Sequence, residues 1–302
     1  DTSLAPYNVG ITAAVETDRC NPAWVQCCNQ MNKVIVPSAH TKKCIENSGM
    51  LNKEIEVIPE SFYDCLLDKE NEKSLGLEFS TDFNFLIFGQ ITGFNPFADR
   101  KNTFYAIKWL CEEFKDNPDV GVVIKTNQGT NSKKDRLLTS KMLDQLLSEV
   151  RKGPYPRIHM LHGSLQQNEI QSVYQHPKIK ALVTATRGEG YGLPILEAAA
   201  TGLPIIATNW SGHLDFMKNG KFIQLDYKLQ PVHESRVDGN IFISGTKWAE
   251  VEESDFKKKV RKFYTSPHKP KEWAEKLAET LKEKYSQKSI NEYYSKSLNG
   301  LL

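Results

Sequence analysis

The sequence lacks several patterns that would assign it to a particular class of protein. None of its six cysteines shows Cys-x-x-Cys spacing, so we predict reduced thiols and neither a zinc nor a redox site. No apolar run approaches the ~18 residues that a membrane-spanning helix needs, and we recognise no signal peptide. A net charge of +2 gives no reason to expect nucleic acid. We therefore predict a cytoplasmic protein without an integral membrane segment.

What the sequence does contain is an alternation of short apolar runs with helix-like segments, from about residue 80 to about residue 285. Strands that are apolar throughout and separated by helices indicate a parallel sheet covered on both faces. We predict a Rossmann-like, doubly wound α/β domain. Its expected strands are 83–89, 120–126, 158–163, 181–186 and 204–208, and its expected helices are 103–114, 141–150, 167–175 and 194–201.

The first part of the chain shows the same alternation on a smaller scale. Segments 8–16, 32–38 and 54–60 read as strands, and helical segments follow the first two. Three strands form only part of an α/β domain, so we predict a partial N-terminal domain over 1–76 and a nucleotide-binding domain over 77–302. Segment 65–82 is the expected linker, and the tail from Asp255 shows two charged helical patterns, the last a candidate to pack back on the first domain.

The most informative stretch is the junction after the expected strand 181–186. Pro194 suits a first helical turn, whereas Leu193 before it has no side-chain oxygen to cap the first amides. Gly202 suits the end of the helix. The free helix N-terminus would then lie at the carboxyl edge of the sheet, where an anion such as a diphosphate can cap it. Gly188, Gly190 and Gly192 would let a ligand approach the backbone.

Two acids surround this junction. Glu189 lies in the loop and Glu197 in the helix, with seven residues between them. A carboxylate can accept two hydrogen bonds from a vicinal diol, so a pair at this edge suits the hydroxyls of a ribose and a hexose. The alternative is that both are surface acids favoured by the helix dipole. The residues alone leave both interpretations open.

Residues 186–208, with their E-x7-E spacing, resemble the signature of retaining GT-B glycosyltransferases, of glycosyltransferase family 4 (glycosyl transferases group 1) in particular. A weaker resemblance extends from about residue 8 to residue 216. It implies two Rossmann-like domains facing across a cleft, with the first half of the N-terminal domain missing. The chain also begins at Asp1 rather than Met, so we interpret it as a shortened form, a processed product or a fragment. The implied activity is retaining sugar transfer from a nucleotide-diphosphate sugar, such as a UDP- or GDP-sugar, without a cofactor or a metal.

The resemblance also implies a role for individual residues. Glu189, Lys101 and Arg100 would be catalytic, with Glu189 on the donor hexose and the cations on the diphosphate. Gln90 stands where the family usually has an arginine, so either Arg100 or Arg187 compensates or the affinity for the donor is lower. The implied donor-binding residues are Gln90, Asn127, His162, Gly163, Gly190, Tyr191, Gly192, Leu193 and Glu197, and the implied acceptor-side residues are Glu16, Thr17 and Ser38.

Two further functions stay open from the sequence. One is a GT-B-fold nucleotide-sugar epimerase, and the other is an inactive or truncated fragment that binds a nucleotide sugar without turnover. The residues do not choose among uracil, guanine and adenine, nor among a carbohydrate, a lipid and a protein as acceptor.

Overall fold

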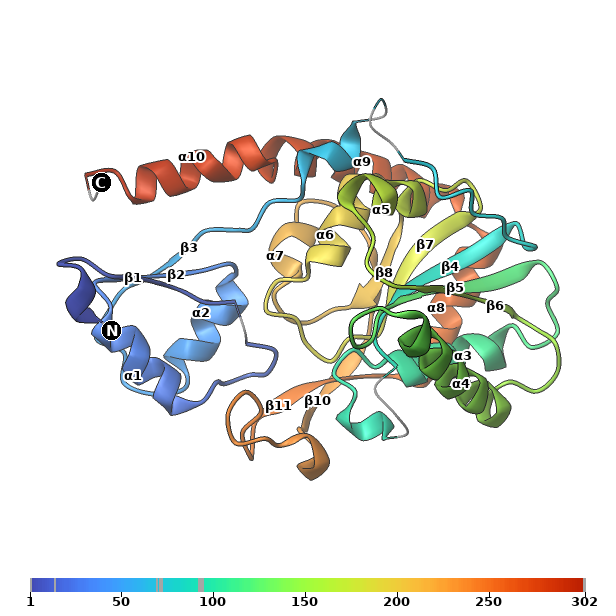
Figure 1. Ribbon diagram of the computed structural model, residues 1–302, viewed down its shortest axis with the longest axis horizontal. Coiled ribbons are helices and arrows are strands. Elements are labelled where there is room, and N and C mark those ends of the chain that lie inside the picture. Colours follow the sequence, from blue (N-terminus) through green and yellow to red (C-terminus); the bar gives the residue numbers. More distant parts are fainter. Residues whose placement is uncertain (1, 14, 69, 71–72, 92–94, 301–302) are drawn as a thin grey trace.

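The computed structural model describes residues 2–13, 15–68, 70, 73–91 and 95–300, and its larger part is a six-stranded parallel sheet (Figure 1). The spatial order of the strands is β6-β5-β4-β7-β8-β9. They are β4 (Phe83–Phe88), β5 (Val120–Thr126), β6 (Arg157–His162), β7 (Ile179–Thr184), β8 (Ile205–Thr208) and β9 (Ile223–Leu225). Numbered within this sheet the order is 3-2-1-4-5-6, that of dinucleotide-binding folds, so the predicted Rossmann-like sheet is confirmed.

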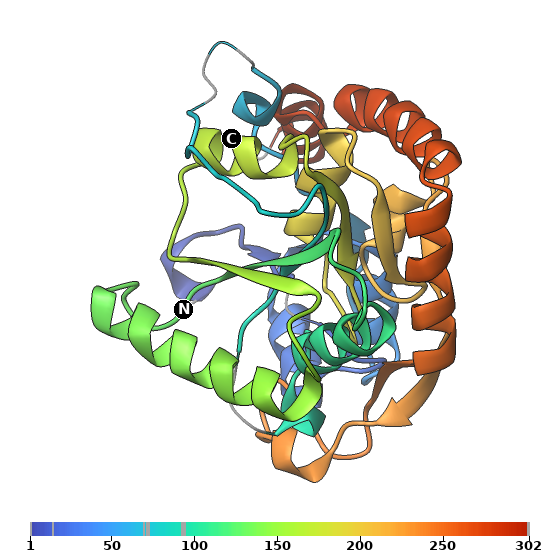
Figure 2. The same ribbon diagram turned by 90° about the vertical axis from the view of Figure 1, so that its right-hand side faces the viewer.

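Helices cover both faces of this sheet. One face packs against α3 (Thr103–Glu113), α4 (Lys133–Val150) and α8 (Glu253–Thr265), and the other against α5 (Gln167–Tyr174), α6 (Leu193–Ala200) and α9 (His268–Lys284). Figure 2 shows α4 and α9 on opposite sides of the strands. Burial on both faces explains why the inner strands β5 and β7 are largely apolar, whereas the edge strand β6 has no buried residue. The order of the strands reverses between β4 and β7, and ligands of such sheets bind where the loops leave that point.

A smaller parallel sheet, in the order β1-β2-β3, forms the first part of the chain. Its elements are β1 (Val9–Ile11), α1 (Pro22–Gln30), β2 (Lys33–Val36), α2 (Ala39–Glu46) and β3 (Ile55–Val57). The last helix, α10 (Gln287–Ser297), returns to this sheet, as Figure 1 shows. Lys33 Nζ donates a hydrogen bond to the Ser297 carbonyl at 2.7 Å. The domain boundary at residues 76 and 77 stays a prediction.

Several elements differ from the sequence expectations. Helix α4 begins at Lys133 rather than at residue 141, because Ser132 and Asp135 form a capping box ahead of two polar turns. The strands β9, β10 (Tyr227–Pro231) and β11 (Lys247–Val251) and the short helix α7 (Leu214–Met217) are absent from the prediction. The tail contains three helices instead of two, since Ser286 caps a separate α10. Within the described part of the expected linker, Leu66 and Phe79 are buried in the main core, whereas residues 69, 71 and 72 lie outside the described residues.

No helix among the described residues is both long enough and apolar enough to cross a bilayer.

Candidate active site

The N-terminus of α6 lies at the carboxyl edge of the sheet and has no side-chain cap. Helix α6 begins at Leu193, one residue before the predicted start, and its N-cap Gly192 has a left-handed conformation with φ 102°. Within the described residues, no hydrogen bond involves the amides of Tyr191, Gly192 or Leu193. This helix end therefore presents free N–H groups and a partial positive charge, as an anion site requires.

Two glycines of the loop before α6 are needed by the fold itself. A Cβ added to Gly188 would lie 1.9 Å from the Glu16 carbonyl oxygen, and one added to Gly190 would lie 1.8 Å from the Ala13 carbonyl oxygen. The segment after β1 therefore passes directly against this loop. Close approach of the chain's own backbone, in addition to any ligand, restricts both positions to glycine.

Glu189 is buried, with 6% of its surface exposed, and two cations bind its carboxylate. Lys101 Nζ lies 2.7 Å from Oε1 and 2.9 Å from Oε2. Arg100 Nη1 lies 3.2 Å from Oε2, and the Thr186 hydroxyl donates to Oε1 at 2.8 Å. Burial disfavours the ionised form, but Lys101 and Arg100 outweigh burial and lower the pKa of Glu189 to about 2. The three predicted catalytic residues thus form one charged cluster.

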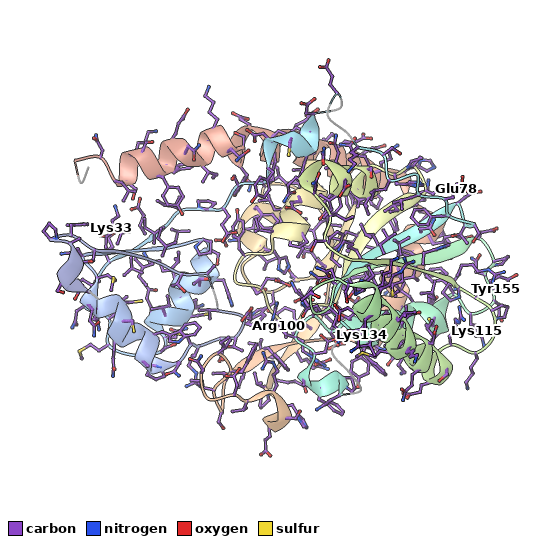
Figure 3. The ribbon with its side chains drawn as sticks, in the orientation of Figure 1. Lys33, Glu78, Arg100, Lys115, Lys134 and Tyr155 are labelled. Atoms are coloured by element: carbon purple, nitrogen blue, oxygen red, sulfur yellow. The ribbon has the colours of Figure 1, made fainter. Side chains whose placement is uncertain are left out.

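Arg100 also links this cluster to the first part of the chain. Its Nε lies 3.3 Å from Glu16 Oε1, and its Nη1 donates to the Gly188 carbonyl at 2.7 Å. In Figure 3, Arg100 lies between the smaller sheet and the six-stranded sheet. Glu16, predicted on the acceptor side, is therefore an ion-pair partner of a predicted catalytic residue.

Arg187 is unavailable to a diphosphate. Its side chain is 2% exposed and makes a bidentate pair with Glu250 at 2.7 and 3.1 Å. Its remaining nitrogen donates to the carbonyls of Pro96 and Asp99. Arg187 therefore holds the loops together, and these contacts argue against its replacing the missing arginine at Gln90, which stays a prediction. Gln90 itself is exposed and makes no hydrogen bond to another described residue.

Glu197 has the opposite electrostatic environment from Glu189. It is 7% exposed, and the Tyr174 hydroxyl donates to its Oε2 at 3.0 Å. Burial raises the pKa of Glu197 to about 7, and the hydrogen bond from Tyr174 offsets only part of that rise. The Tyr174 ring stacks on Phe88 of β4, with the centroids 5.3 Å apart. Sequence reasoning missed Tyr174, because an aromatic residue at a helix end is typical of a core position.

A hollow of about 10 Å³, roughly the volume that one water needs, lies beside Glu189 and Lys101. Phe88, Lys101, Glu189, Gly192, Pro194 and Ile195 are among the residues around it. A larger hollow of about 630 Å³ lies at the opposite, amino edge of the sheet, beside Pro177, Ile179 and Pro204. The larger hollow is on the wrong side of the sheet for the helix N-terminus and both acids, so volume alone does not locate the site.

The other predicted site residues lie at the ends of β5 and β6 and in the first part of the chain. Asn127 is exposed just after β5, whereas His162 ends β6 with a buried Nε2 that has no partner among the described residues. Ser38 caps α2 and donates from its hydroxyl to the Gly190 carbonyl at 2.7 Å. The Thr17 hydroxyl donates to the Arg19 carbonyl at 2.6 Å, a local turn contact.

Comparison with known protein families gives one match, which covers the middle of the chain. Residues 97–227 match the family described as Glycosyl transferases group 1, and this match contains Arg100, Lys101, Glu189 and Glu197. No curated protein is detectably similar in sequence.

Solved structures show the same fold at low sequence identity. Sucrose-phosphate synthase from Thermosynechococcus elongatus superposes with a TM-score of 0.61 and 13% identity, covering 92% of this chain and 60% of that one. The pneumococcal O-GlcNAc transferase GtfA, in complex with UDP and GlcNAc, gives 0.58 and 15%, covering 97% and 52%. A glycosyltransferase from Rickettsia africae ESF-5 gives 0.66 and 14%, covering 97% and 71%. The chain thus spans less than two thirds of the first two proteins. It has the fold of GT-B glycosyltransferases, and residues 97–227 are similar to the family Glycosyl transferases group 1.

Proposed function

We propose that this site transfers a sugar from a nucleoside-diphosphate sugar to an acceptor, with retention of configuration at the anomeric carbon. The observation that carries the proposal is the uncapped N-terminus of α6 at the switch point of the sheet, beside Lys101 and Arg100. Free amides and two cations at one position suit a diphosphate leaving group. No cofactor and no metal are part of the proposal, and the acceptor can be a carbohydrate, a lipid or a protein.

The proposed role of the cations is to stabilise charge that develops on the diphosphate as the glycosidic bond breaks. In the ligand-free protein both cations bind Glu189, so a bound diphosphate would become their new partner. Cations already oriented at the leaving group need little reorganisation during the reaction. Once Lys101 turns to the phosphate, the carboxylate of Glu189 can accept hydrogen bonds from the hydroxyls of the donor hexose.

Glu197 has a different proposed role, the binding of the ribose diol. Its carboxyl has a single hydrogen-bond partner among the described residues, the hydroxyl of Tyr174, and this leaves acceptor capacity for a diol. Two solved relatives contain the expected kinds of ligand. GtfA was solved with UDP and GlcNAc, and Alr3699/HepE from Anabaena with UDP and glucose. The nucleoside diphosphate and the sugar in each of these two structures support the class of donor proposed here.

A second candidate function is binding of a nucleotide sugar without turnover. One observation favours it: the exposed Gln90 offers no cation to the diphosphate. No observation favours the epimerase.

A donor screen tests the proposal. Nucleoside diphosphates and their sugars are added to the protein, and the shift in melting temperature and the release of nucleoside diphosphate are both measured. A ligand at 100 times its dissociation constant adds about 2.7 kcal/mol to the free energy of unfolding. Lys101→Met should abolish the shift, and Lys108→Met, which breaks a pair with Glu112 within α3, should keep it. Binding with release supports transfer, binding without release supports the second candidate, and no binding at all contradicts both.

A further inference from the structure

The carboxyl edge of the sheet holds a buried lysine that the proposed reaction does not yet use. Lys125 is the last residue but one of β5, and only 8% of its surface is exposed. Its ammonium donates to the Gly163 carbonyl at 2.6 Å, and no carboxylate of the described residues lies within ion-pair distance. An ammonium has three donors, so two remain unused.

The fold gains little from a charge in this position. Burial alone lowers the pKa of Lys125, which agrees with the absence of a neighbouring carboxylate. Removing an ammonium from water without an anion partner is unfavourable, and a methionine would fill the same volume without that penalty. Groups that conflict with stability in this way are concentrated at binding sites.

Strand register places Lys125 on the same face of the sheet as the two acids. In the parallel ladder Lys125 is aligned with Phe88 of β4 and Leu161 of β6, so the three side chains share one face. Phe88 borders the hollow beside Glu189 and stacks on Tyr174, the partner of Glu197. Lys125 therefore faces the same region as the proposed donor.

The distance along the sheet indicates which part of the donor Lys125 would reach. Helix α6 follows β7, and β4 lies between β7 and β5, so two strand spacings, about 10 Å, separate the diphosphate position from Lys125. Such a separation is too long for a direct phosphate contact and suits the far end of a nucleotide. In the opposite direction the chain packs closely on the site loop, with Trp210 beside Gly188 and Gly212 beside Gly190. A Cβ added to Gly163, in contrast, would meet no atom within 4 Å.

We propose that Lys125 reads the base of the donor and favours a base with a carbonyl oxygen, uracil or guanine, over adenine. An ammonium only donates, so it matches O4 of uracil or O6 of guanine, whereas adenine carries an amino group, itself a donor, at the corresponding position. A hydrogen bond from a charged donor to such an oxygen corresponds to about a tenfold or greater preference. This inference rests on the proposed function, since it requires a nucleoside diphosphate at α6.

The test compares Lys125→Met with Lys180→Met. Lys180 is a half-buried lysine of β7 that also donates to a backbone carbonyl, that of Pro177, but it lies toward the amino edge of the same sheet. Dissociation constants for UDP, GDP, ADP and pyrophosphate are measured by calorimetry, and melting temperatures are recorded in parallel. We expect Lys125→Met to melt no lower than the unchanged protein, to bind pyrophosphate equally well, and to lose the preference over ADP by about tenfold.

Three results would overturn the inference. The first is that Lys125→Met keeps the ratio of UDP and GDP affinity to ADP affinity, whether or not all ligands bind more weakly and the melting temperature falls. That result means that Lys125 only holds the loop at Gly163. A preference for ADP in the unchanged protein contradicts the assigned base class. Failure of the unchanged protein to bind any nucleoside diphosphate overturns the proposed function as well. If Lys125→Met does not fold, Lys125→Gln provides the same comparison.

Discussion

At the scale of single residues, the site contains two buried glutamates with opposite electrostatics. Two cations hold the pKa of Glu189 at about 2, whereas burial with a single tyrosine partner raises that of Glu197 to about 7. Glu189 is therefore ionised throughout the physiological range, and Glu197 changes its charge within it. Two glutamates eight positions apart in the chain therefore have opposite shifts in pKa, because their neighbours differ.

The raised pKa of Glu197 predicts how stability depends on pH. Its ordinary pKa is 4.5 and its folded pKa is about 7, so between these values the folded protein holds a proton that the unfolded chain has released. The free energy of unfolding should therefore fall as pH rises through this window, by up to about 3 kcal/mol from this group. Urea denaturation at pH 5 and pH 7.5 measures the change. Glu197→Gln should remove the part of the pH dependence that comes from Glu197. If the variant showed the same pH dependence as the unchanged protein, the raised pKa of Glu197 would be contradicted.

Charge at Glu189 predicts a separation of binding from turnover. Glu189→Gln keeps the shape of the side chain but releases Lys101 and Arg100 from a competing carboxylate. It should bind nucleoside diphosphate at least as tightly as the unchanged protein, while turnover of the nucleotide sugar drops by about a hundredfold. Glu197→Ala should instead weaken binding of the nucleoside diphosphate itself. If the two variants lost nucleoside diphosphate binding and nucleotide-sugar turnover to the same extent, the result would argue against separate roles for Glu189 and Glu197.

At the scale of elements, the hairpin of β10 and β11 stabilises the loop that carries the site. Glu250 of β11 pairs with the buried Arg187, and the Ala249 amide donates to the Arg187 carbonyl at 2.9 Å. Asp18, in the first part of the chain, donates from its amide to the Lys247 carbonyl at 2.9 Å. The hairpin therefore connects the site loop with the segment that follows β1.

Removing Glu250 should test this connection. Glu250→Ala leaves a guanidinium that is 2% exposed without its carboxylate, and losing one partner of a buried pair costs about 3 kcal/mol. The matched control is Lys228→Ala, which breaks the exposed pair with Glu252 in the same hairpin and should cost less than about 1 kcal/mol. Chemical denaturation compares the two variants, and a similar small loss in both would show that Arg187 is held mainly by the backbone carbonyls.

At the scale of the whole molecule, the smaller sheet contacts the site loop directly. Ser38 and Thr41, at the start of α2, both donate hydroxyl hydrogen bonds to the Gly190 carbonyl, at 2.7 and 3.2 Å. Glu16 reaches Arg100 across the same boundary. The position of the loop, and with it the helix N-terminus, therefore depends on residues of both sheets.

The Glu16 contact predicts a change in affinity. Glu16→Gln removes one of the two carboxylates that compete with a diphosphate for Arg100. A partly exposed pair contributes about 1 kcal/mol, so nucleoside diphosphate should bind about fivefold more tightly by calorimetry. Glu56→Gln is the control, because it breaks a comparable pair with Lys33. Figure 3 labels Lys33 in the smaller sheet. Weaker binding by Glu16→Gln would mean that Glu16 contributes to the donor site.

The sequence by itself determined the features that depend on neighbours in the chain. Strands with apolar residues throughout predict the parallel sheet, and Pro194 after a residue without a capping oxygen predicts the uncapped start of α6, because periodicity and capping act over a few residues. Short or polar elements such as β9 and the first turns of α4 have too little periodicity to be recognised.

Only the tertiary structure decided which charged groups meet. Lys101 and its partner Glu189 are 88 residues apart in the chain, and Arg187 and Glu250 are 63 apart. The burial of Lys125 depends on the register of β5 between two other strands. Pairings of this kind follow from how distant segments pack, and a pKa follows in turn from those pairings, so neither can be inferred from local sequence.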